Sequence, residues 1–231
     1  MSRALLERVA SGELPETLRL ARPGRIVAFG KQDAIASGYE EAVAAARAGG
    51  FEAIQRLAGG RAAVFHEGTL AFAHAVPDSD PKPGIQARFA LVAEVMAAAF
   101  RRLGVDARVG EVPGEYCPGG HSVNAGGRRK LMGVGQRLIA GGAHVGGVVV
   151  VDGADLVNGI LTPVYAALGL SFDPDATGSL AGEAVAAAVT LDGVRAAIVE
   201  EYEARYELEP WELDDGTLAL ARSLAPEHLP V

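Results

Sequence analysis

The chain has 231 residues, of which 49% are hydrophobic and 22% charged, so it can bury a sizeable core and is not globally disordered. Its formal net charge of −8 argues against nucleic acid as the main partner, because phosphate contacts need a basic surface. The single cysteine excludes a disulfide framework and a cysteine-rich zinc site, and it suits a reducing cytosol.

The first third of the chain predicts two helices and several short strands. We expect helices over 1–20, broken by Pro15, and over 38–48, closed by a Gly-Gly pair. A short apolar run predicts a strand over 25–29. Three further runs favour strands that together form a bent hairpin: 51–57, 61–65 and 69–76.

Apolar residues at intervals of three and four predict the clearest helix, over 85–103. A strand over 107–112 and an irregular Gly-rich stretch over 113–124 follow it. We then expect two antiparallel strands, 130–139 and 143–151, joined at a Gly-Gly turn. The remainder reads as helical, with predicted helices over 155–168 (interrupted at Pro163), 182–189, 194–206 and 214–223.

Strands therefore come first and helices last, which favours an α+β fold: one central, mixed and largely antiparallel sheet flanked by helices. We expect a single domain over 1–231, with 182–231 as its helical finish. No apolar run is long enough to span a bilayer, and 1–22 carries charges throughout and lacks the apolar core of a signal peptide. The sequence thus predicts a cytoplasmic protein without membrane or nucleic-acid partners.

Cys117 is the first candidate for chemistry. It stands in Gly-Glu-Tyr-Cys-Pro-Gly-Gly-His-Ser, where glycine and proline on both sides predict an accessible loop. A thiolate in such a loop is a competent nucleophile, and the nearby His121 is a candidate to activate it. The alternative is that Cys117 is an inert small residue, as lone cysteines usually are.

Lys130 opens a strand that contains Gly133, and a glycine within a strand often marks the close approach of a ligand. This favours a lysine at the mouth of a pocket that holds a carboxyl or carbonyl oxygen. The alternative is a surface lysine in a basic turn. No pair of histidines has metal-ligand spacing, so we predict no metal site.

Gly59 and Gly60 form a third candidate, because a Gly pair between strands bares backbone N–H groups that can bind an anion or a carbonyl oxygen. The alternative is an ordinary turn. His66 and Glu67 follow as a possible acid–base pair. Neighbouring residues of a strand point to opposite faces, so only one of the two can face a pocket.

Together these segments resemble the lipoate–protein ligase and octanoyltransferase superfamily, and its cysteine-dependent branch in particular. That branch carries a Tyr-Cys-Pro-Gly loop, a Gly-x-x-Lys-x-x-Gly-x-x-Gln segment and an Arg-x-x-Gly-Gly-x-Ala segment that leads to Glu-Gly-x-Leu. Here the matching positions are Tyr116 to Gly119; Gly127, Lys130, Gly133 and Gln136; Arg56, Gly59, Gly60 and Ala62; and Glu67, Gly68 and Leu70.

The resemblance implies a fold similar to class II aminoacyl-tRNA and biotin synthetases, with a narrow apolar tunnel for an acyl chain. It implies that Cys117 forms an acyl-thioester and that Lys130 binds the acyl carbonyl. A lysine ε-amine on a lipoyl domain would then take the octanoyl or lipoyl group. The residues that the resemblance implies for substrate binding are Arg56, Gly59, Gly60, Ala62, His66, Gly133 and Gln136.

Two alternatives stay open. An ATP-dependent ligase shares Lys130, but its Arg-Arg-x-Ser-Gly-Gly-Gly-Ala-Val-x-His-Asp pattern is altered here at Gln55, Ala58, Arg61, Phe65 and His66. ATP and magnesium are expected only for that ligase, and the transferase needs no cofactor. The other alternative is a non-catalytic binder of acyl chains or lipoyl domains.

The partners that the resemblance implies are lipoyl-domain proteins: the glycine-cleavage H protein and the E2 subunits of 2-oxoacid dehydrogenases. Acyl carrier protein is a further candidate donor. The family is often monomeric, and we expect a monomer here.

Overall fold

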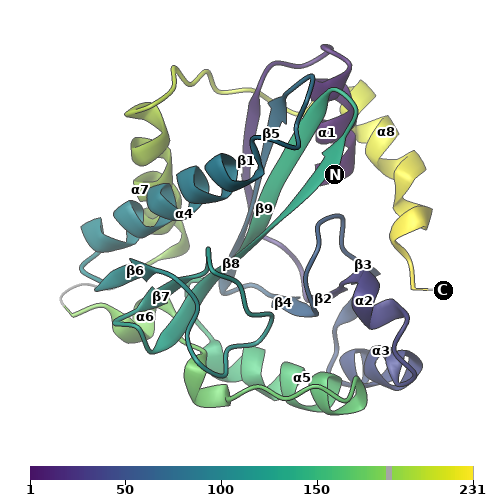
Figure 1. Cartoon of the computed structure of the whole chain (residues 1–231), viewed down its shortest axis with the longest axis vertical. Helices are drawn as coiled ribbons and strands as arrows, with labels where there is room; N and C mark the ends of the chain where they lie inside the picture. The colour runs from purple at the N-terminus through teal and green to yellow at the C-terminus, as the bar shows by residue number, and fades with distance from the viewer. Residues whose placement is uncertain (186–188, 231) are drawn as a thin grey trace.

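The computed structural model describes residues 1–185 and 189–230 and contains two sheets (Figure 1). The larger sheet has the strand order β1-β5-β9-β8-β7-β6, with antiparallel neighbours throughout. Its strands are β1 (Thr17–Ala21), β5 (Thr69–Pro77), β6 (Ala107–Val109), β7 (Val123–Ala125), β8 (Arg129–Ile139) and β9 (Gly142–Val150). The smaller sheet has the order β3-β2-β4, with bounds β2 (Ile26–Phe29), β3 (Glu52–Gln55) and β4 (Ala63–Phe65).

Helices surround both sheets (Figure 1). The longest, α4 (Ile85–Arg102), packs against α7 (Leu191–Glu203) over one face of the larger sheet, and α3 (Tyr39–Ala48) packs against α5 (Ala154–Ala167) beside the smaller sheet. Near the N-terminus, α1 (Ser2–Ala10) contacts α8 (Asp215–Leu224). The short helices are α2 (Lys31–Ala34), η1 (Pro174–Ala176), α6 (Leu180–Glu183) and η2 (Ala225–His228). The predicted α+β class is confirmed.

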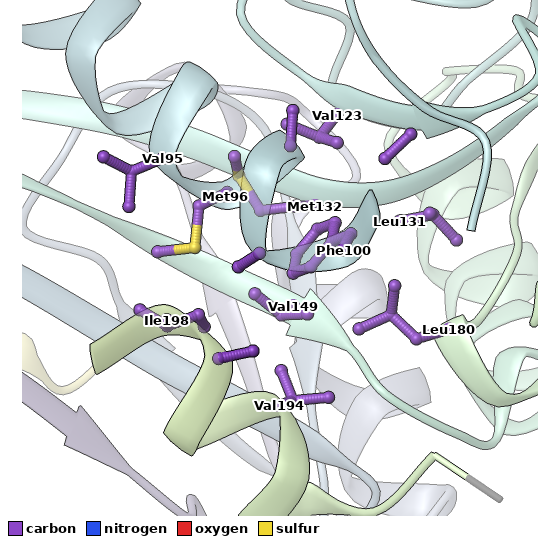
Figure 2. Packing of buried hydrophobic residues seen from close by; sticks show 14 of the residues in the cluster. Val95, Met96, Phe100, Val123, Leu131, Met132, Val149, Leu180, Val194 and Ile198 are labelled. Atoms are coloured by element: carbon purple, nitrogen blue, oxygen red, sulfur yellow. The ribbon is translucent and has the colours of Figure 1, made fainter. Parts of the chain in front are cut away.

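Strand β9 divides the interior into two hydrophobic clusters. Successive side chains of a strand point to opposite faces. Accordingly Val145 and Val149 join the cluster under α4 and α7, whereas Val148 and Val150 join the cluster between the smaller sheet, α3 and α5. Figure 2 shows the first cluster, in which Phe100 of α4 lies among side chains from β8, β9 and α7. Because both faces of β9 are buried, its apolar residues are nearly continuous.

Two strand predictions were wrong. The second half of the predicted first helix is strand β1, which pairs with β5. The predicted hairpin does not form, because β3 and β4 flank β2 in the smaller sheet while β5 pairs with β1 and β9 in the larger one. A tight turn in which Thr69 N–H donates to the carbonyl of His66 (2.9 Å) takes the chain from one sheet to the other.

The later helices follow the predictions more closely. Helix α5 continues through Pro163, which was predicted to interrupt it. The predicted helix over 182–189 ends at Glu183, since Ala184 is already extended, and residues 186–188 of that prediction lie outside the described residues. Within 1–185 and 189–230, no helix has the length and apolar character needed to cross a membrane.

Candidate active site

A cavity of about 560 Å³ lies where β8, the 113–122 loop, the start of α4 and the segment between β3 and β4 meet. Apolar side chains line much of its wall, among them Phe65, Ile85, Phe89, Val134 and Val148. The sequence-predicted residues that line the same cavity are Arg56, Gly59, Gly60, Cys117, Lys130, Gly133 and Gln136. Segments far apart in the sequence thus bring the thiol and the lysine to one apolar space.

Cys117 is half-buried and has a φ of +44°, which makes it the only non-glycine with positive φ in the described part of the chain. This left-handed conformation costs an ordinary residue roughly 1–2 kcal/mol. Its N–H donates to the hydroxyl of Tyr165 (2.9 Å), which donates to the carbonyl of Ala62 (3.1 Å). The nucleophile candidate is therefore held by a residue of α5 that sequence reasoning did not single out.

The thiol faces the segment between β3 and β4. Cys117 Sγ accepts the backbone N–H of Arg61 at 3.1 Å, and Nη1 of Arg56 lies 3.9 Å from the same sulfur. Gly60 (φ +111°) leaves the room for this approach, because a Cβ there would lie 2.9 Å from Sγ. Nη1 of Arg61 is 3.2 Å from the buried carboxylate of Asp33, which anchors the segment to α2. Both N–H donors therefore reach the sulfur from one well-anchored segment.

Lys130 points into the protein from β8 and is 1% exposed. Its Nζ donates to Glu115 Oε1 (2.9 Å), to the carbonyl of Tyr116 (2.9 Å) and to the carbonyl of Cys117 (2.8 Å). Gly133 makes space for this side chain, since a Cβ there would lie 3.2 Å from Lys130 Cε. An ammonium has three hydrogens, so all are engaged, and an acyl carbonyl could bind Nζ only by displacing one of these acceptors.

Gln136 lines the cavity with both ends of its amide engaged. Its Nε2 donates to the carbonyl of Ile85 (2.7 Å), and its Oε1 accepts from Nε of Arg88 (3.2 Å). Through these two hydrogen bonds, Gln136 of β8 holds the start of α4 in place. His121 also lines the cavity, stacked on the ring of Phe89 with 5.0 Å between centroids. No hydrogen bond joins His121 to Cys117 among the described residues.

Two predicted substrate-binding residues lie outside the cavity lining. Ala62 is fully buried and contributes only its carbonyl, through Tyr165. His66 is buried beside Gly68 and Gly153, where its Nδ1 accepts the N–H of Gly68 (3.0 Å) and burial lowers its pKa. Neither side chain is therefore placed to contact a ligand in this cavity. The strand alternation explains the placement of His66, since its neighbour Phe65 faces the cavity instead.

Residues 1–202 match the family described as "Lipoyl protein ligase A/B catalytic domain", and the chain belongs to that family. It is 33% identical, over 65% of its length and 54% of the relative's, to octanoyl-[GcvH]:protein N-octanoyltransferase of Anoxybacillus flavithermus. Its identity to the enzyme of that name from Geobacillus kaustophilus is 28%, over 72% of this chain and 58% of the relative. The chain spans about half the length of these curated relatives.

A solved structure of lipoate-protein ligase A bound with ATP shares the fold, with a TM-score of 0.75 over 97% of this chain and 88% of that one. Its sequence identity is 19%, so the likeness concerns the fold alone. The predicted family and the similarity of the fold to that of lipoate ligases are confirmed.

Proposed function

We propose that this protein transfers an octanoyl group to the ε-amine of a lysine on a lipoyl-domain protein, through a thioester on Cys117. One observation carries the proposal: the only thiol of the chain lies at the wall of an apolar-lined cavity, with its sulfur 3.1 Å from the Arg61 nitrogen. The cavity volume is within the usual range for small-molecule sites. The names of the curated relatives support octanoyl as the acyl group.

The reaction then has two steps. The Cys117 thiol attacks the acyl carbonyl of the donor and gives up its proton; the C–S bond forms, the bond to the leaving group breaks, and that proton goes to the leaving group. The acceptor amine attacks the thioester; the C–N bond forms, the C–S bond breaks, and a proton of the amine returns to sulfur. The donors nearest Sγ, the Arg61 N–H and the Arg56 guanidinium, are the candidates to stabilise the oxyanion of each step.

The relatives are named for the H protein, which supports an octanoylated H protein as the donor. We propose an E2 lipoyl domain as the acceptor, acyl carrier protein as a further donor, and no requirement for ATP or another cofactor. An ATP-dependent ligase is less well supported, because the relatives are transferases by name and the ligase structure shares only the fold.

The test is to mix the protein with octanoylated H protein, without ATP, and to record its intact mass and peptide map. We expect an octanoyl adduct on Cys117, release of the adduct to an added lipoyl domain, and neither event in Cys117→Ser. Modification of the lipoyl domain only with free octanoate and ATP, surviving in Cys117→Ser, would make the protein a ligase. Acyl or carrier binding without turnover would make it a binder.

A further inference from the structure

Glu115 is a buried carboxylate that has no part in the two-step transfer. Its side chain is 0% exposed and accepts four hydrogen bonds. Oε2 accepts the N–H of Val112 (3.0 Å), while Oε1 accepts the N–H of Gly119 (3.2 Å), the hydroxyl of Ser122 (2.7 Å) and Nζ of Lys130 (2.9 Å). A carboxylate that accepts this many hydrogen bonds is a structural hub: it holds together the segments that carry the donors.

The four donors place that hub at the centre of the cysteine loop, which we define as residues 112–122. Val112 begins the loop, Gly119 lies within it and Ser122 ends it, so one side chain closes the loop on itself. Lys130 lies on β8, outside the cysteine loop, and connects that strand to the loop because it donates to Glu115 and to the carbonyls of Tyr116 and Cys117. The loop has no strand or helix of its own to fix its shape.

The backbone of Cys117 needs such a fixed shape. Its φ of +44° is unfavourable for a side chain with a Cβ, and it persists only where the surroundings impose it. The Cys117 carbonyl is held by Lys130 and the Cys117 N–H by Tyr165, so both polar groups of the residue are pinned. The hold on the carbonyl depends on Glu115, because Lys130 is buried and a buried ammonium without its counter-charge is strongly disfavoured.

We propose that Glu115 is the positioning residue of the nucleophile: through Lys130 and the cysteine loop it holds Cys117 in the left-handed conformation that places Sγ against the Arg61 N–H. Its effect on rate rests on the proposed function, since it presumes that Cys117 is acylated. Its effect on the conformation of Cys117 does not.

The experiment compares Glu115→Gln with Glu111→Gln, which removes an exposed carboxylate just before the same loop. Because the chain has one cysteine, protein labelled with ¹³C,¹⁵N-cysteine gives one backbone signal, and that signal reports the conformation of Cys117 without any substrate. We expect the signal to move toward its unfolded-chain position in Glu115→Gln and to stay in Glu111→Gln. In amide exchange, Val112 and Gly119 should lose protection in Glu115→Gln only.

With an octanoyl donor, the maximal rate of thioester formation in Glu115→Gln should fall about 100-fold, because a misplacement of about 1 Å costs that much. The KM for the donor should stay unchanged, and Glu111→Gln should match the wild type. A merely structural role would lower the melting temperature and leave both the cysteine signal and the rate below melting unmoved, and that result would overturn the proposal.

Two outcomes keep the tests separate. If the wild type forms no thioester, the proposed function fails, but the cysteine signal still decides whether Glu115 sets the conformation of Cys117. If Glu115→Gln does not fold, Ser122→Ala takes its place, since it removes one of the four bonds and keeps the charge pair. A smaller displacement of the same signal is then expected, and an unmoved signal in Ser122→Ala would contradict the proposal.

Discussion

Replacing Gly60 by alanine should separate the stability of the protein from the placement of its thiol. Gly60 has a φ of +111°, and an added Cβ would lie 2.9 Å from Cys117 Sγ and 3.0 Å from Nη1 of Arg56. Real Cβ atoms essentially never show contacts below 3.0 Å, so the sulfur or the guanidinium must shift. The substitution thus strains the backbone and also pushes the nucleophile away from its donors.

The two effects have different sizes. A side chain at positive φ costs roughly 1–2 kcal/mol, which lowers the melting temperature of a domain this size by about 2–8 °C. A typical stability of about 5–15 kcal/mol leaves the variant folded. A displaced sulfur costs far more in rate, and we expect thioester formation to slow about 100-fold.

Gly50→Ala is the matched control. Gly50 also has positive φ (+80°), but an added Cβ there meets nothing within 4 Å, and the residue lies at the end of α3, outside the cavity lining. Melting curves of both variants and single-turnover thioester formation give the comparison. We expect similar losses of stability and a loss of rate only in Gly60→Ala. Equal rates in the two variants would refute the inferred contact between Gly60 and the thiol.

Three other substitutions test the packing and charge of the molecule. Tyr165→Phe leaves the Cys117 N–H and the Ala62 carbonyl without their partner, so urea titration should show a loss of about 1–3 kcal/mol together with slower thioester formation; an unchanged protein would mean that these hydrogen bonds contribute nothing. Phe100→Ala empties a fully buried position under α4 and should lower the free energy of unfolding by about 3–5 kcal/mol, and a loss below about 1 kcal/mol would contradict the packing in Figure 2. Burial lowers the pKa of His144 to about 4. As the pH falls below about 6.5, the histidine of the unfolded chain takes up a proton while the native histidine stays neutral. The free energy of unfolding therefore falls by up to about 1.4 kcal/mol per pH unit, down to about pH 4. The stability difference between wild type and His144→Leu should therefore change between pH 7 and pH 4.5, and a constant difference would show that His144 does not titrate in this way.

Local patterns predicted much of the fold. The apolar spacing of residues 85–103 identified α4, and the two runs around a Gly-Gly turn identified the β8–β9 pair. The second sheet could not be read in the same way. Whether 61–65 pairs with 25–29 or with 69–76 depends on which faces are buried, and these short segments look alike in either arrangement. Strand β1 was missed because its five residues are all only partly buried and show no alternation.

At the site, the motif residues led to the cavity, but their supports did not show in the sequence. Tyr165 lies 48 residues from Cys117, and nothing in a helical sequence marks it as a partner of a distant backbone N–H. Glu115 looks like any loop carboxylate, and only its burial beside Lys130 distinguishes it. The likeness to a motif also predicted His66 and Ala62 as substrate-binding residues, although neither side chain lines the cavity.

The thiol and the lysine lie where the two clusters of the interior adjoin, and the Lys130 ammonium lies 4.8 Å from the centre of the Tyr116 ring. Cys117 packs against the cluster of the smaller sheet, and Lys130 comes from β8, whose neighbouring residues Leu131 and Met132 belong to the cluster under α4 and α7. The candidate site thus lies at the boundary between two clusters that share β9, and hydrogen bonds from Lys130 to the Cys117 and Tyr116 carbonyls cross that boundary. Because β9 contributes side chains to both clusters, a loss of packing in either one acts on the strand that joins them. The Cys117–Lys130 contact should therefore respond to substitutions in either cluster, including those far from the cavity.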